Sequence, residues 1–536
     1  MPTLNWIGKQ AVEKHHLEIP YRLLEYDENL SVGDKESGNL LIQGDNLHAL
    51  KALLPYYAGK VKCIYIDPPY NTGNEGWQYN DNVNAPEIKA WLNKVVGSEG
   101  EDLSRHDKWL SMMYPRLQLL KKLLRQDGAI LISIDDNEQC YLLPIMMEIF
   151  GKQNFICSFI WQKKHTVAND ARFVSDNHDF ILFFVKNINS FIINKLPRTE
   201  LADSRYTNPD NDLRGSWASG PCHAKTPNEK DIYELITPSG RKIFPPAGTS
   251  WRFSKEKFAD LIKDNRIWFG KNGNNIPRVK RFLTEVSEGM ISPTILLREM
   301  VGDNQEANQE ITSILGKGKF SNPKPTRLIK RLIRLASNKN DLILDSFSGS
   351  GTTGQAVVEL NKEDGGNRKF ILVELEEKIA KEVTAERLKR VINGYVSQKQ
   401  NGTTEQVEGL GGGFRYCNLS EPLFDQFGNV RQGVKFKELA RHIFFSENGI
   451  PLSEKAKLNT PLIGVYKGVA YYLLFNGILG DKSVNGGNVL TSKNLESVPK
   501  HNGPKIIFGE SNRLSAARLK KENIVFKQIP YEIKTS

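Results

Sequence analysis

The chain has 536 residues, 39% of them apolar and 25% charged, so large cores and a solvated surface are possible and disorder as the main state is excluded. At roughly 150 residues per domain, this length suggests about three or four folding units. The net charge of +11 is uneven: residues 1–187 carry 20 basic against 24 acidic residues, residues 188–330 carry 23 against 16, and residues 331–536 carry 30 against 22. A basic middle and end are typical of proteins that hold a polyanion, although basic proteins are also common for other reasons.

No run approaches the roughly 18 apolar residues that a membrane-spanning helix needs, and the first residues lack the apolar stretch of a signal peptide. The cysteines form no CxxC pair, which argues against a zinc ribbon and a disulfide scaffold. We therefore expect a cytoplasmic, multidomain globular protein without a membrane segment or a metal centre. The five cysteines are Cys63, Cys140, Cys157, Cys222 and Cys417.

The first part of the chain, residues 40–187, alternates between predicted strands and helices. Apolar runs that stop at acids or glycine predict strands, and helical spacing of apolar residues predicts the segments between them. Such alternation indicates a mainly parallel sheet covered on both faces. The predicted strands are 40–44, 61–67, 129–135 and 180–185, and the predicted helices are 46–57 and 116–127.

A second alternating part covers residues 323–395 and ends with a helix that Gly394 terminates. Residues 188–320 between the two parts are rich in Asn, Pro, Gly, Lys and aromatics and show weak periodicity. Residues 405–414, EQVEGLGGGF, are typical of a linker, and residues 415–536 predict a small α/β unit.

The first candidate site is the Asp67-Pro68-Pro69-Tyr70 turn directly after the strand VKCIYI. Ligands of open parallel sheets lie at the carboxyl ends of strands. A carboxylate and a Pro68 carbonyl can accept both hydrogens of an exocyclic amine, and Tyr70 offers a flat face for stacking. The alternative is a proline-rich turn with a capping Asp, but the preceding strand and the following Asn-Thr-Gly favour a functional role.

The second candidate site is DSFSGSGTTG, from Asp345 to Gly354, again between a predicted strand and a helix. Gly349 and Gly351 allow close approach to a ligand, but the loop lacks the Lys-Ser/Thr of an ATP-binding loop. The next strand ends at Glu374, where a ribose diol is usually held. The pattern indicates an adenosine-bearing cofactor without a pyrophosphate, such as S-adenosylmethionine, and its alternative is a helix-capping glycine loop.

Together these sites resemble the amino-group DNA methyltransferases in their beta motif order, in which DPPY precedes FxGxG and the target-recognition region lies between. LIQGDNLHALKALLP, IDPPYNTGNEGWQYND, SRHDKWLSMMYPRL, GAILISIDDNE and NPKPTRLIKRLI resemble in particular the modification (Mod) subunits of type III restriction-modification systems. The resemblance covers about residues 38–395. It implies an α/β fold: a Rossmann-like S-adenosylmethionine-dependent methyltransferase sheet in circularly permuted motif order.

The residue pattern, with the resemblance over 38–395, predicts an N-terminal extension (1–39), a catalytic half (40–187), an inserted target-recognition region (188–320), a cofactor half (321–395) and a linker (396–414). Residues 415–536, beyond the resemblance, are predicted to form a small C-terminal α/β domain for docking or dimerisation. The resemblance also assigns residues. Its catalytic residues are Asp67, Pro68, Pro69 and Tyr70. Its cofactor residues are Asp345, Phe347, Gly349, Gly351, Thr352 and Glu374, with Lys324 and Pro325 closing over the methionine end.

Two further residues have two interpretations each, and two more have one. Asp45 matches a family position that faces the base or cofactor, and it is equally a helix N-cap before NLHAL. Trp161 is a candidate for the base pocket or a core aromatic. Asp135 and Asp136 cap a strand end.

The implied function is transfer of a methyl group from S-adenosylmethionine to N6 of an adenine flipped out of duplex DNA. DPPY, rather than SPPY, implies adenine. The resemblance implies a homodimer and an ATP-dependent helicase-nuclease partner on another chain. The alternatives are a solitary adenine methyltransferase and, more remotely, a catalytically silent DNA-binding subunit. Cys222 is the one cysteine that follows a proline, but it lies away from any predicted strand end, so C5-cytosine methylation is not favoured.

Overall fold

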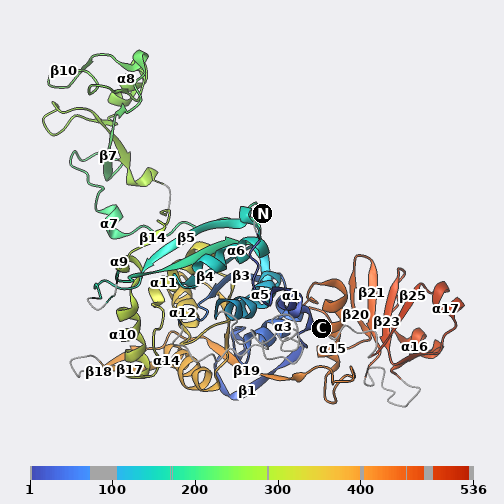
Figure 1. The fold of residues 1–536 in the computed structure, drawn as a ribbon. Coiled ribbons are helices and arrows are strands. Elements are labelled where there is room, and N and C mark those ends of the chain that lie inside the picture. The colour runs from blue at the N-terminus through green and yellow to red at the C-terminus, as the bar shows by residue number, and fades with distance from the viewer. Residues whose placement is uncertain are drawn as a thin grey trace. The chain divides into compact units, whose positions relative to one another are not determined.

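The computed structural model describes residues 3–72, 105–168, 171, 173–286, 289–398, 404–453, 455–475 and 487–529. The chain divides into two compact units (Figure 1). The larger unit joins Met1–Asn194 to Pro293–Ser536, and the smaller unit is Lys195–Ser292. The division lies inside the predicted insert of 188–320 and is narrower than it.

The larger unit is built on a mixed sheet, which contains ten strands within the described residues. Its central strands β2, β16, β15, β3 and β4 are parallel to one another. Beyond them, β6 runs antiparallel to β4, and β5 runs antiparallel to β6. The strand order is β1 (Arg22–Gly33), β19 (Gly413–Pro422), β2 (Leu40–Gln43), β16 (Lys369–Glu374), β15 (Leu342–Asp345), β3 (Val61–Ile66), β4 (Leu124–Ile134), β6 (His178–Val185), β5 (Phe155–Gln162) and β14 (Ile295–Leu296).

Two groups of helices cover this sheet (Figure 1). Apolar residues at i, i+3 and i+4 explain why they pack: the helix that begins at Thr326 buries Leu328, Ile329, Leu332 and Ile333 on one face. One group is α3 (Asn46–Tyr57), α5 (Arg105–Leu123) and α6 (Gln139–Phe150). The other is α10 (Asn304–Leu315), α11 (Thr326–Ala336), α12 (Thr352–Asp364) and α14 (Glu386–Asn393).

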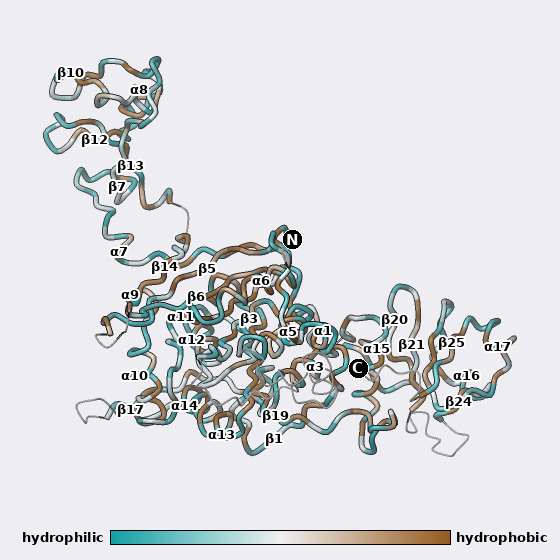
Figure 2. Tube along the Cα trace, in the orientation of Figure 1, coloured by the Kyte–Doolittle hydropathy of each residue, from teal (hydrophilic) through white to brown (hydrophobic). Residues whose placement is uncertain are grey.

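The central strands are largely buried, since both faces are covered by helices. All six residues of β3 are buried, and the strands of the sheet are mostly hydrophobic (Figure 2). This is the composition that a parallel sheet between two helical layers requires. Most predicted strands and helices of residues 40–187 and 323–395 are confirmed, including the end of α14 at Gly394, which has φ 92°. The helix predicted over 116–127 instead ends at Leu123, because β4 begins at Leu124.

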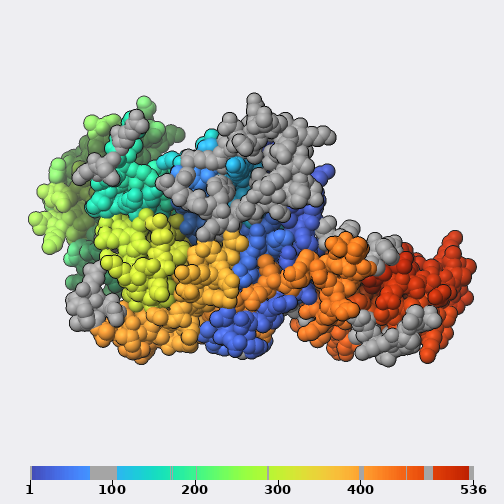
Figure 3. All heavy atoms as spheres, turned by 60° about the horizontal axis from the view of Figure 1, so that its bottom comes forward, coloured from blue at the N-terminus to red at the C-terminus, as the bar shows by residue number. Residues whose placement is uncertain are grey.

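The ends of the central sheet differ from the prediction. Residues 22–33, expected in an extension, form β1, and residues 413–422, expected at the junction of a linker and a separate domain, form β19 between β1 and β2. Figure 3 shows the blue N-terminal part against the orange part that contains β19. The expected linker also contains a hairpin of β17 (Gly394–Gln398) and β18 (Thr404–Glu408). These pairings are long-range or lie in polar segments, so local apolar periodicity does not report them.

The remainder of the C-terminal part forms a smaller sheet of β20 (Leu462–Tyr466), β21 (Val469–Leu473), β23 (Lys505–Gly509) and β25 (Ile524–Gln528). Helices α16 (Ser492–Ser497) and α17 (Ala516–Lys521) lie between its strands in sequence, as expected for a small α/β unit. Helix α15 (Phe436–Asn448) contacts both α3 and β20, so this sheet is joined to the central one by packing.

The smaller unit has its own apolar core around α8 (Lys255–Lys263). Its main sheet has the order β12 (Ile267–Trp268), β13 (Arg278–Phe282) and β7 (Trp217–Pro221), and two strand pairs, β8 (His223–Ala224) with β11 (Ser250–Trp251) and β9 (Leu235–Ile236) with β10 (Lys242–Ile243), complete it. Cys222 lies fully buried in that core, and burial raises the pKa of its thiol to about 12. It is a core residue here.

Within the described ranges, no helix has both the length and the apolarity that a membrane span requires.

Candidate active site

One edge of the central sheet gathers the acids that follow its parallel strands. Because β2, β16, β15, β3 and β4 run in the same direction, their carboxyl ends meet at this edge. Strand β6 runs the opposite way, so its first residues, His178 and Asp179, lie at the same edge. The acids at or just after the parallel strand ends are Asp45, Asp67, Asp135, Asp345 and Glu374.

The Asp67–Tyr70 turn is held by hydrogen bonds to both of its ends. The Tyr70 hydroxyl donates to Asp67 Oδ1 at 2.9 Å, and Trp109 Nε1 donates to the Pro69 carbonyl at 2.6 Å. Pro68 is buried. Burial and the nearby Asp67 carboxylate raise the pKa of Tyr70 well above its ordinary value, so the phenol keeps its proton and can donate it to Asp67. The neutral ring offers a flat face for stacking.

Lys324 joins this turn from the segment before α11. Its Nζ lies 2.6 Å from Asp67 Oδ2, 5.0 Å from the centroid of the Tyr70 ring and 5.8 Å from that of Trp161. The following residue, Pro325, is the N-cap of α11. The resemblance implies that Lys324 closes over the methionine end of the cofactor, and in the structure its side chain binds Asp67.

Sequence reasoning missed two residues of this site, Asp179 and Lys163. Lys163 Nζ lies 2.7 Å from Asp179 Oδ1 and 2.6 Å from Asp176 Oδ2, and the Tyr70 hydroxyl lies 3.4 Å from Asp179 Oδ2. Burial raises the pKa of Asp179, against the opposing effect of Lys324 and Lys163. The available signal was an acid directly before the apolar run FILFFV, at the start of a predicted strand.

The glycine loop follows β15 and faces the end of β16. Gly349 and Gly351 have φ of 48° and 79°, the left-handed region that favours glycine. The Gly349 amide donates to Glu374 Oε2 at 2.8 Å, and the Glu376 amide donates to Oε1 at 3.1 Å. The loop and the acid expected to hold a ribose therefore contact each other directly.

The start of the loop is fixed by Asp345. Its carboxylate accepts hydrogen bonds from the Phe347 amide at 3.0 Å and from the Thr353 hydroxyl at 2.5 Å, and Phe347 is buried. Thr352, the first residue of α12, accepts a hydrogen bond from Arg387 Nη1 at 2.8 Å. This network holds the loop in place at the helix N-terminus.

The loop fits an adenosine-bearing cofactor by two observations. The hydroxyls of Ser346 and Ser348 are buried and have no hydrogen-bond partner among the described residues, so they are available to a polar ligand. A Cβ at Gly349 would come within 3.1 Å of Phe320 Cζ, so the space beside the loop is narrow and bounded by the edge of an aromatic ring. The adjoining acid, Glu374, supplies acceptors for hydroxyl groups.

Two buried acids at this site make stability depend on pH. Burial raises the pKa of Asp345 to about 7 from its ordinary 3.8, and burial likewise raises that of Glu374 to about 7. A folded-state pKa above the unfolded value means that the folded chain holds the proton more tightly. The stabilisation that these two protonated acids contribute is therefore complete below about pH 4 and is lost as the pH rises through about 7.

We expect Asp345→Asn to remove much of this pH dependence, because it removes the buried charge while its one amide oxygen still accepts from the Phe347 amide. The free energy of unfolding of the variant, relative to the wild type, should rise between about pH 5 and pH 8 by on the order of a few kcal/mol. Denaturant unfolding at both pH values measures it. A constant difference at the two pH values would contradict the assignment.

Asp45 and Trp161, for which the sequence allows two interpretations each, make structural contacts near this edge. Asp45 is the N-cap of α3: it accepts from the Leu47 amide at 2.6 Å and pairs with Arg116 at 3.1 Å. Trp161 is fully buried, and its Nε1 donates to the Gly302 carbonyl at 3.0 Å. The capping interpretation of Asp45 and the core interpretation of Trp161 account for these contacts.

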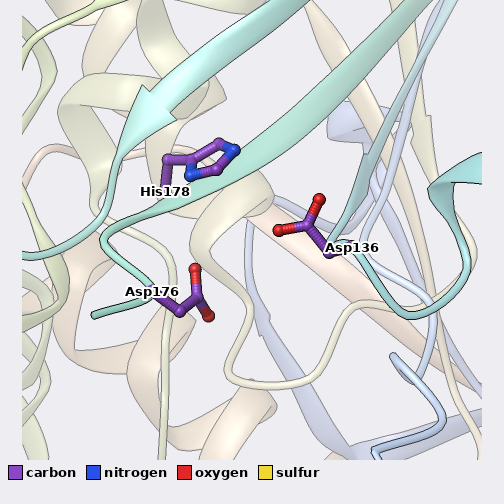
Figure 4. A group of neighbouring side chains, drawn as sticks. All are labelled: Asp136, Asp176 and His178. Atoms are coloured by element: carbon purple, nitrogen blue, oxygen red, sulfur yellow. The ribbon is translucent and has the colours of Figure 1, made fainter. Parts of the chain in front are cut away.

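Asp136, Asp176 and His178 converge beside the site, and their ligand atoms lie within 4.8 Å of one another (Figure 4). Both carboxylates are exposed, and Asp176 already pairs with Lys163. A cation there would compete with this lysine, so we assign no metal to the group.

The central sheet, its two helical layers and the paired loops at one edge define an α/β fold of the DNA methyltransferase class. The family model described as "DNA methylase" matches residues 61–386. The chain belongs to this family.

Relatives of known identity include the StyLTI Mod subunit of a type III restriction-modification enzyme from Salmonella typhimurium. It is 34% identical over 400 residues, which cover 72% of this chain and 60% of that protein. The EcoPI Mod subunit of Escherichia phage P1 is 32% identical, with 71% and 64% covered. The type II methyltransferase M.KpnI of Klebsiella pneumoniae is 31% identical, with 66% and 84% covered.

The match thus spans about 60–64% of the length of these type III relatives. Similar solved structures include the PvuII cytosine-N4-specific DNA methyltransferase, at 15% identity and a TM-score of 0.33, covering 65% of this chain and 86% of that chain. A complex of M1.HpyAVI with SAM has 16% identity and a TM-score of 0.30, covering 65% and 98%.

Proposed function

We propose that this protein is a site-specific DNA adenine N6 methyltransferase that uses S-adenosylmethionine and acts as the modification subunit of a type III restriction-modification system. One observation carries the proposal: β3 and β15 are parallel neighbours, with Cys63 opposite Ile343 and Ile64 opposite Leu344. The Asp67 turn and the glycine loop therefore follow adjacent strands at one edge, as methyl transfer between a base and a cofactor requires.

The roles of the residues follow from their chemistry. S-adenosylmethionine, when bound, supplies a methyl group activated on its sulfonium. Ser346, Ser348 and Glu374 would hold the cofactor. Asp67 accepts a hydrogen of the target amine and, with the Pro68 carbonyl, aligns the nitrogen lone pair, while Tyr70 stacks on the flipped base.

The choice of adenine over cytosine rests on the first residue of the turn. Asp67 stands where the N4-cytosine enzymes of the resemblance carry Ser, and the type III relatives carry the name Mod. Sequencing of modified bases in DNA from cells that express this chain tests the proposal. N6-methyladenine at a defined sequence supports it, whereas N4-methylcytosine or no modification contradicts it.

We expect Tyr70→Ala to lose much more methyl transfer than Tyr70→Phe or Tyr70→Trp, because a flat ring keeps the stacking of the flipped base. Stacking is worth roughly 1–3 kcal/mol per base, so methyl transfer by the alanine variant should fall by about 5- to 150-fold. Transfer of a tritiated methyl group to DNA measures it. Equal losses in the three variants would show that the hydroxyl bond to Asp67 matters instead.

Sequence recognition is proposed for the insert of residues 188–320, which contains the smaller unit. Its segments interleave Arg and Lys with aromatics, and Arg214 and Arg266 both lie over the Phe282 ring. Exchange of 188–320 with that of a relative should change the methylated sequence, and DNA binding should weaken steeply with salt. An unchanged sequence would place recognition elsewhere.

A homodimer and an ATP-dependent helicase-nuclease partner are proposed with the type III assignment, acting on duplex DNA in the cytoplasm. The second candidate is a solitary adenine methyltransferase. A methyltransferase of the type II class also matches, since this chain covers 84% of M.KpnI and 60% of StyLTI Mod. Co-purification of a helicase-nuclease with the tagged chain, encoded beside it, distinguishes the two.

A further inference from the structure

The ammonium of Lys324 lies where the target amine is expected. It contacts Asp67 Oδ2 at 2.6 Å and lies over the Tyr70 ring at 5.0 Å from the centroid. These are the two partners that a flipped base needs: the carboxylate accepts an N–H, and the ring face takes a stacked group. A base stacked on that face would occupy the volume that the ammonium takes.

The backbone of Lys324 is held in place. Its carbonyl accepts a hydrogen bond from the Thr352 hydroxyl at 3.2 Å, and Pro325, the N-cap of α11, follows it directly. The backbone is therefore fixed to the cofactor half, while the flexible four-carbon stem reaches across to the turn after β3.

Asp179 is placed to receive the displaced ammonium. Its Oδ1 binds Lys163 at 2.7 Å, and its Oδ2 lies 3.4 Å from the Tyr70 hydroxyl, which also binds Asp67. The Asp179 side chain is 4% exposed, so a second cation beside it offsets the cost of burying a carboxylate. Lys324 already acts on it, since its charge lowers the pKa of Asp179 against the effect of burial.

We propose that Lys324 is a positioning residue that stands in for the target amine: it holds Asp67 and the face of Tyr70 in the free protein and moves to Asp179 as the base enters. The inference rests on the proposed base-binding role of Asp67 and Tyr70. Base entry then exchanges one N–H donor on Asp67 Oδ2 for another, while Oδ1 keeps the Tyr70 hydroxyl as its donor.

The test compares two duplexes that carry the methylated site mapped in the wild type, one with adenine and one with an abasic residue at the target position. The dissociation constant of the abasic duplex divided by that of the adenine duplex measures the contribution of the target base, because the phosphate contacts are the same in both. Lys324→Met should raise this ratio about fivefold, because the base no longer displaces an ion pair. Lys319→Met, which removes an exposed lysine of the same segment, should leave the ratio unchanged.

A second variant tests the destination. Asp179→Asn should lower the ratio in the wild type but not in the Lys324→Met background, because its effect depends on receiving the ammonium. An unchanged or lowered ratio for Lys324→Met, or an Asp179→Asn effect of the same size in both backgrounds, overturns the proposal. Failure of the proposed function would be seen separately, because DNA from cells that express the wild-type protein would then carry no methylated base. That result would overturn both the proposed function and this inference.

Discussion

Asp67→Ala should abolish methyl transfer, with a loss of about 10²–10³-fold or more in kcat, while binding of the cofactor and of DNA is largely preserved. Asp67 accepts from the Tyr70 hydroxyl and from Lys324, and the proposed reaction replaces the lysine by the target amine. Removal of the carboxylate leaves no charged acceptor to align that amine. Single-turnover transfer and calorimetric binding measure the two effects.

Asp136→Ala is the matched control, because Asp136 is an exposed carboxylate at the same sheet edge. Asp67→Asn keeps an acceptor oxygen and should retain more transfer than alanine. Substantial residual transfer in Asp67→Ala would show that the carboxylate does not act on the amine. Parallel loss of cofactor binding would show that Asp67 holds the cofactor half together instead.

Gly351→Val should block cofactor binding, with a loss of at least about tenfold in affinity, equivalent to about 1.4 kcal/mol. The position has φ 79°, and a Cβ there would lie 3.0 Å from Thr384 Cγ2. The valine must shift the loop that carries the two buried serine hydroxyls. Calorimetric titration with S-adenosylmethionine measures the affinity.

Gly365→Ala is the control for backbone strain alone. Gly365 has φ 65° at the C-terminus of α12, and a Cβ there meets nothing within 4 Å. It should be destabilised by about 1–2 kcal/mol while binding the cofactor normally. Normal affinity in Gly351→Val would contradict the placement of the cofactor at this loop.

The central strands and helices were predictable because their signals are local. The fully apolar run of β3 and the capping Asp45 before α3 mark these elements within a few residues. The turn after β3 and the glycine loop were predictable for the same reason, since each is a short word at a strand end. Their adjacency follows from the parallel sheet.

The contact between Lys324 and Asp67 was not predictable, because 257 residues separate them and the side chain of Lys324 crosses from one half to the other. Asp179 was missed because an antiparallel strand brings its start, rather than its end, to the functional edge. Both depend on the direction of a strand or the path of a side chain, and neither leaves a periodic signal in the sequence.

The position of β19 has a consequence for how the chain is made. The strand lies between β1 and β2, and its partner residues in β1 are separated from it by most of the chain, as in the pair Arg22 and Pro422. On a ribosome, β1 emerges early, but its strand partner among the described residues, β19, exists only once residues 413–422 are synthesised. At about 5–20 residues per second, that strand waits about 20–80 seconds for its partner. The edge of β2 that pairs with β19 is exposed during this time. The nascent chain therefore depends on protection of that edge until residue 422 has been synthesised.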